Sequence, residues 1–189
     1  MKKYLLLTLI MTIVPAIAFS QTTIHTEDFE TNSDGFNTSI AEFSDGATDY
    51  FTRTDGTDSV STLNFSNVQG TIYFAAQDID DGGATLPVTL DIDDIDVSGF
   101  TDLKFKVFLA EDDDGSNQDW DSSDFVKINY DIDNSGTFLD LLHIRNDGTQ
   151  FNSAPFIDTD CDGIGDGTEI TETLTQITAN ISETCTILA

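Results

Sequence analysis

The chain has 189 residues, a length typical of one domain, and it carries 35 acidic against 7 basic residues. Its formal net charge of −28 at pH 7 repels phosphate backbones, so we expect no nucleic-acid partner. Two compatible explanations of the charge stay open. The carboxylates keep a secreted protein soluble in salty water, or some of them converge on divalent cations that neutralise their repulsion.

The first 20 residues predict a secretory signal peptide. Lys2 and Lys3 open the chain, an apolar run extends to Val14, and small residues follow at Ala18 and Ser20. The run is shorter than the roughly 20 apolar residues of a membrane-spanning helix, so we expect no membrane span. The alternative is a buried N-terminal strand. Cleavage after residue 20 removes two lysines, so the remaining domain of residues 21–189 has a net charge of −30 and lies outside the cell or on its surface.

The remaining chain is rich in Thr, Ser, Asp, Gly and Phe, which favours strands and turns over helices. Residues 103–109 and 125–132 alternate between apolar and polar side chains, with the period of two of a half-buried strand. Further strands are expected at 23–29, 50–53, 71–76, 88–92, 138–144 and 174–181. Turn clusters separate them, and the cluster at 134–136 predicts a hairpin. The pattern predicts an all-β fold, an antiparallel β-sandwich.

Acidic residues follow several of these strands and form a weak candidate for a second cation site. Its ligands would be Glu30, Asp78 and Asp80, provided that the strand ends converge at one rim. The alternative of turn-forming carboxylates that face water is favoured for each of them. Residues 131–136 also place acids at the first and third positions and a glycine at the sixth, but their hairpin context favours a plain turn.

Trp120 is the single tryptophan, and it stands between Asp119 and Asp121 in a polar loop. One interpretation is a sugar-stacking platform whose neighbouring carboxylates accept hydroxyl protons. The other, slightly favoured, is that the ring folds back and caps the sandwich core.

The segment 158–169 carries the strongest chemical signal. It fits the calcium-loop pattern D-x-[DN]-x-[DN]-G-x5-E, in which alternate carboxylates of a curling loop point inward and a glycine permits the sharp turn. The predicted calcium ligands are Asp158, Asp160, Asp162, the backbone carbonyl of Ile164, Asp166 and Glu169. The alternative is a solvated acidic loop.

One position departs from helix-loop-helix calcium hands, which carry an aliphatic residue where this loop has Gly165. The flanking segments do not read as helices either. The loop is therefore more similar to the calcium repeats of thrombospondin type 3, with the pattern D-x-D-x-D-G-x-x-D.

Two cysteines, Cys161 and Cys185, predict one disulfide in a secreted chain. The alternative is two free thiols. The bridge would tie the calcium loop to the C-terminal strand.

We expect no catalysis. The sequence contains no nucleophile elbow, zinc-protease helix, phosphate-binding loop or dinucleotide fingerprint, and its two histidines, His25 and His143, are far apart. His143 falls in the apolar run "LLHI" and reads as a core or inter-strand residue.

Several segments together resemble an accessory β-sandwich module of secreted multidomain proteins of marine and gut bacteria. They are "EDFETNSDGF", "DYFTRTDG", "IYFAAQDIDDGG", "VSGFTDLKFKVFLAEDD", "DWDSSDFVKINYDID" and "DTDCDGIGDGT". The resemblance implies a jelly-roll-like, non-catalytic module. Such modules usually end in a further strand, whereas this chain stops at "TCTILA", so we expect the last strand to be missing or the chain to be part of a larger protein with further domains.

These observations predict a secreted, non-catalytic, calcium-binding module for adhesion or for binding a glycan or cell-surface partner. The alternatives are the N-terminal part of a secreted hydrolase, of the carbohydrate-active or phosphoesterase type, and a structural spacer domain whose sole ligand is calcium.

Overall fold

The computed structural model describes residues 21–32, 34–46, 48–57, 65–80, 84–112 and 120–181. The predicted signal peptide and Cys185 lie outside these ranges. Within them the chain forms ten strands and no helix, and the strand pairs are all antiparallel. The all-β antiparallel sandwich is thus confirmed.

The strands form four small sheets. In chain order they are β1 (Phe36–Thr38), β2 (Phe43–Ser44), β3 (Tyr50–Thr54), β4 (Tyr73–Gln77), β5 (Leu90–Ile92), β6 (Lys104–Leu109), β7 (Val126–Tyr130), β8 (Leu139–Asn146), β9 (Pro155–Asp158) and β10 (Thr175–Asn180). The sheets have the orders β1-β5, β2-β3-β4, β6-β10 and β7-β8-β9.

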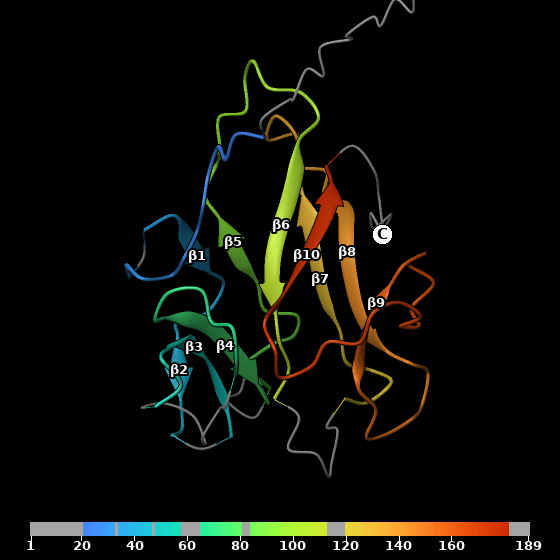
Figure 1. Cartoon of the computed structure of the whole chain (residues 1–189). Coiled ribbons are helices and arrows are strands. Elements are labelled where there is room, and N and C mark those ends of the chain that lie inside the picture. Colours follow the sequence, from blue (N-terminus) through green and yellow to red (C-terminus); the bar gives the residue numbers. More distant parts are fainter. Residues whose placement is uncertain are drawn as a thin grey trace, which may run out of the picture.

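The main hydrophobic core lies between the β6-β10 and β7-β8-β9 sheets, which face each other in the C-terminal half (Figure 1). Alternate residues of these strands point inward, as a period of two requires. The buried core residues are Leu142, Ile144, Ile157, Ile170 and Ile177, and Val107, Leu109, Trp120 and Ile128 pack against them.

A second apolar centre holds the N-terminal half together. Four phenylalanine rings meet there, with centroids 4.8–6.2 Å apart and mostly edge-to-face, the arrangement that aromatic quadrupoles prefer. They are Phe29, Phe36, Phe51 and Phe74.

The two halves are joined through Ser66, which forms a parallel bridge with Thr173. Ser66 N–H donates to the Glu172 carbonyl (3.1 Å), and Leu174 N–H donates to the Ser66 carbonyl (3.0 Å). The segment that follows the predicted calcium loop is therefore fixed to the N-terminal half.

Seven of the strands expected from the sequence are confirmed as β3 to β8 and β10, and the hairpin expected at 134–136 connects β7 to β8. The strand expected at 23–29 is wrong. Residues 21–28 are mostly exposed and have no ladder partner, and Phe29 turns the chain with a φ of 60°. Strands β1, β2 and β9 were not expected because each is only two to four residues long, too short for a periodic signal.

Substitution of Leu142 by alanine tests the main core. Leu142 is 1 % exposed, so the truncation should leave a cavity and lower the free energy of unfolding by about 2–5 kcal/mol. Chemical denaturation measures the change. Phe138→Ala is the control, because Phe138 is 66 % exposed and its loss should change stability by less than about 0.5 kcal/mol. Equal effects of the two variants would contradict this assignment of the core.

Candidate metal centre

The first residue of the predicted calcium loop, Asp158, is also the last residue of β9. In the β8-β9 pairing it lies directly opposite His143, so the two side chains share the outer face of the sheet. Asp158 is only 1 % exposed, and its side chain is fully buried. A strand end thus places a carboxylate inside the protein.

The loop after Asp158 folds back onto the strands from which it came. Asp166 N–H and Gly167 N–H both donate to the Ile157 carbonyl (3.1 and 2.7 Å), and Ile157 N–H donates to the Thr168 carbonyl (2.9 Å). Gly165 N–H donates to the Asn146 carbonyl (2.7 Å). The main chain of β8 and β9 therefore holds both sides of the loop.

Asp158, Asp160 and Asp162 come together at the start of this loop. One carboxylate oxygen from each lies within 4.8 Å of the others. Two oxygens that bind one calcium ion at about 2.3–2.6 Å are at most about 5 Å apart. The three carboxylates are therefore close enough together to be candidate ligands of one ion.

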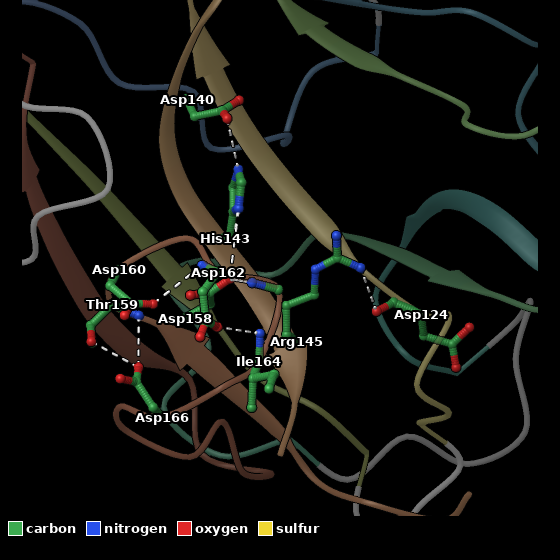
Figure 2. A network of polar contacts seen from close by, with 11 residues as sticks. Asp124, Asp140, His143, Arg145, Asp158, Thr159, Asp160, Asp162, Ile164 and Asp166 are labelled. Atoms are coloured by element: carbon green, nitrogen blue, oxygen red, sulfur yellow. Dashed lines mark hydrogen bonds and ion pairs between the residues drawn. The ribbon is translucent and has the colours of Figure 1, made fainter. Parts of the chain in front are cut away.

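Hydrogen bonds within the loop set this arrangement. Asp158 Oδ2 accepts from Gly163 N–H (3.0 Å), Asp160 Oδ1 from Asp162 N–H (3.2 Å) and Asp162 Oδ1 from Ile164 N–H (2.9 Å). Each carboxylate thus caps a main-chain amide a few residues further on, as Asp commonly does in turns. The contacts are visible in Figure 2.

The other oxygen of Asp158, Oδ1, is buried and has no hydrogen-bond partner in the described residues. A buried carboxylate oxygen without a partner is costly, because it has lost its hydration and gained nothing in return. Asp160 and Asp162, in contrast, are exposed. The site is closed at Asp158 and open to solvent at its other two members.

The remaining three predicted ligands lie outside this group. Asp166 Oδ1 accepts from Thr159 N–H (2.9 Å) and from the Thr159 hydroxyl (2.7 Å), and these bonds lower the pKa of Asp166. Glu169 is exposed and forms an antiparallel bridge with Phe156, and the Ile164 side chain is 46 % exposed. The structure brings together three of the six predicted ligands, and the roles of Ile164, Asp166 and Glu169 stay predictions.

Two glycines explain why the loop has this sequence. Gly163 has a φ of 98°, a conformation that other residues rarely adopt. Gly165 packs against the main chain of β8, where an added Cβ would lie 2.5 Å from the Arg145 carbonyl oxygen and 2.6 Å from Phe156 Cβ. The aliphatic residue of helical calcium hands does not fit at position 165, because here the loop packs on a sheet.

Gly165→Ala tests this packing. The methyl group should push the loop off β8 and expose the amides of Asp166 and Gly167 to hydrogen exchange, with a cost in stability of about 1–3 kcal/mol. Exchange mass spectrometry over residues 157–168 measures the effect. Gly99→Ala is the control for the loop: nothing lies near its Cβ position, and although its φ of 83° strains an added side chain and costs stability, the protection of residues 157–168 should stay unchanged. Unchanged protection of the loop in Gly165→Ala would contradict the contact.

The weak second cation site is not assembled in the described part of the chain. Glu30, Asp78 and Asp80 do not belong to any group of three metal-binding side chains there. Glu30 Oε1 instead accepts from the main-chain N–H groups of Thr71 and Ile72, which holds the turn before β4.

Trp120 packs against the main core and pairs its main chain with Ser153. This packing is what the core-capping alternative requires, and a stacking role of the ring stays untested. Asp131 accepts from the N–H and hydroxyl of Ser135 and from Gly136 N–H, which fits the plain-turn interpretation of 131–136.

His143 is 4 % exposed in β8, so its expected place as a core or inter-strand residue is correct. The predicted disulfide of Cys161 stays a prediction, because Cys185 lies outside the described residues.

No protein-family model, no curated protein and no solved structure matches this chain. The resemblance to an accessory module therefore stays a prediction. The described residues include no helix long and apolar enough to cross a membrane.

Proposed function

We propose that the protein is a secreted, non-catalytic β-sandwich module that binds calcium through Asp158, Asp160 and Asp162. The observation that carries the proposal is the buried Asp158 Oδ1, which has no hydrogen-bond partner among the described residues although Asp158 belongs to a cluster of three carboxylates. A cation at this place would supply the missing partner and offset the repulsion among three negative charges.

The donor atoms favour calcium over softer metals. All three side chains offer carboxylate oxygen, the ligand type of calcium and magnesium, and neither histidine nor cysteine belongs to the group. The loop also follows the calcium-loop spacing, and calcium tolerates irregular shells of six to eight oxygens better than magnesium does. The exposed side of the site leaves room for water in that shell.

Calcium would serve a structural purpose in this module. Main-chain hydrogen bonds to Ile157 and Asn146 already hold the loop in place. The ion would therefore reduce the repulsion among its carboxylates, and the loop would not need the ion in order to fold. We expect an affinity on the order of 0.1–1 mM, as in other extracellular modules.

Thermal unfolding with calcium and with chelator tests the proposal. At about 2 mM calcium such an affinity should raise the Tm by about 2–7 °C. Sodium chloride at equal ionic strength should produce no comparable rise, and Asp160→Ala/Asp162→Ala should abolish the shift.

The matched control is Asp94→Ala/Asp96→Ala. It removes two carboxylates with the same Asp-x-Asp spacing from a segment outside the cluster, so it should keep the calcium shift. Equal Tm shifts with calcium and sodium would show that the carboxylates form only a screened acidic surface, and the calcium proposal would be withdrawn.

We further propose that the module binds a glycan or cell-surface partner. The loops at 120–125 and 147–153 lie side by side, since Ser122 N–H donates to the Gln150 carbonyl (3.2 Å). They carry Phe125 and Phe151, which are 44 % and 58 % exposed. The Arg145 guanidinium lies over the Phe125 ring, 4.7 Å from its centroid, so Phe151 is the ring that is more available for stacking on a sugar than Trp120, which packs against the core.

A glycan array tests this partner. Binding should be lost on Phe151→Ala and kept on Phe138→Ala, which removes a similarly exposed ring from the β7-β8 turn. Trp120→Ala should lower the free energy of unfolding and leave the glycan selectivity unchanged, because the ring packs against the core. An array without hits would instead favour the structural spacer.

A further inference from the structure

A row of polar side chains lies next to Asp158 on the outer face of the β7-β8-β9 sheet, and of its members His143 and Asp158 are buried whereas the Asp140 side chain is 44 % exposed. His143 lies opposite Asp158, with its Nδ1 3.9 Å from Asp158 Oδ2. Its Nε2 lies 3.3 Å from Asp140 Oδ2. Figure 2 shows the imidazole ring between the two carboxylates.

A β-bulge places Asp140 at this point. Ile128 pairs with Leu142, but the next residue, Asn129, pairs with Asp140, so Leu141 has no partner in the ladder. An extra residue of this kind redirects the neighbouring side chains, and bulges are frequent next to functional sites. With its amide nitrogen turned toward β8, Asn129 donates to Asp140 Oδ1 (3.0 Å).

The chain Asn129–Asp140–His143–Asp158 therefore crosses three strands. Packing alone does not account for it, because His143 Nε2 and Asp158 Oδ1 are both buried without a hydrogen-bond partner in the described residues. A leucine, as at the neighbouring Leu141 and Leu142, would fill the same space without that cost. The buried polar atoms therefore point to a role other than packing.

The arrangement of Asp158 indicates that role. Its Oδ2 accepts from Gly163 N–H and lies 3.9 Å from His143 Nδ1, whereas Oδ1 has no hydrogen-bond partner in the part of the chain that the structure describes. Groups behind a ligating carboxylate orient it and are important for metal affinity.

We propose that His143, which lies between Asp140 and Asp158, is a positioning residue for the cation site: it fixes the Asp158 carboxylate so that Oδ1 is presented to the ion. This inference rests on the calcium binding proposed above. His143 itself does not belong to the group that would contact the metal.

The test compares the calcium affinities of the whole chain and its variants. Each affinity is measured by titration from the NMR chemical shifts of the Gly163 and Ile164 amides, a method that is suitable for dissociation constants in the millimolar range. His143→Leu fills the site without any N–H and should weaken the affinity about tenfold or more. His143→Asn keeps a donor near the position of Nδ1 and should recover most of the loss. Lys127→Met is the matched control, because Lys127 pairs with His143 across β7 and β8 but lies outside the polar chain.

The thermal stability of the metal-free variants separates positioning from folding. A positioning role requires that His143→Leu loses affinity while its metal-free Tm stays near that of His143→Asn. Equal affinities of His143→Leu and the unchanged protein, or equal losses in both His143 variants, would overturn the inference and leave the calcium site standing. Absence of calcium shifts in the unchanged protein would instead overturn the proposed function.

Asp140→Asn provides a second route if the leucine variant does not fold. It preserves the shape of the side chain and removes the negative charge that lies 3.3 Å from His143 Nε2, and it should weaken calcium binding about threefold or more. An unchanged affinity in this variant would also overturn the inference.

Discussion

The antiparallel pairing of β8 with β9 is the interaction on which the rest of the C-terminal half depends. It buries Ile157 in the core and Asp158 on the opposite face, because neighbouring residues of a strand point to opposite sides. The same two strands offer the carbonyls of Asn146 and Ile157, to which the loop bonds. Apolar burial on one side thus supplies the free energy that keeps a carboxylate buried on the other.

The acidic loop is consequently bonded to the main chain of β8 and β9. Gly165 lets it approach the β8 main chain, and the bonds of Asp160 and Asp162 to nearby amides hold its curvature. The three carboxylates are close together before any ion is considered. Such preorganisation reduces the conformational entropy that binding must overcome, and the repulsion among the carboxylates becomes the main quantity that a cation changes.

Periodicity was sufficient to predict most of the fold. Strands β6, β7 and β8 are long enough, with five to eight residues, for alternation to appear in the sequence. Strand β9 has four residues and begins at Pro155, and its place follows from pairing with β8. Residues 23–29 show the reverse case. Their amino-acid composition is typical of a strand, but they have no neighbouring strand to pair with and do not form one.

The candidate site was predictable to a similar degree. Loop spacing identified Asp158, Asp160 and Asp162, because ligand positions in a tight loop are local in sequence. The loop spacing did not indicate that Asp158 is buried or that it lies opposite His143. Both follow from the pairing of β8 with β9, a strand that was not expected. The bulge that brings Asp140 to His143 is likewise a property of strand register, which one strand alone does not reveal.

The first and last described residues, 21 and 181, lie at one end of the sandwich. Gln21 contacts Lys106, and Ile181 N–H donates to the Leu103 carbonyl, so the first and last described residues both lie near the start of β6. The loops that carry Phe125 and Phe151 lie at the other end of the sandwich (Figure 1). Residues 21 and 181 and the two loops with exposed rings are therefore separated by the length of the sandwich, so a substitution in these loops leaves the contacts at the start of β6 untouched.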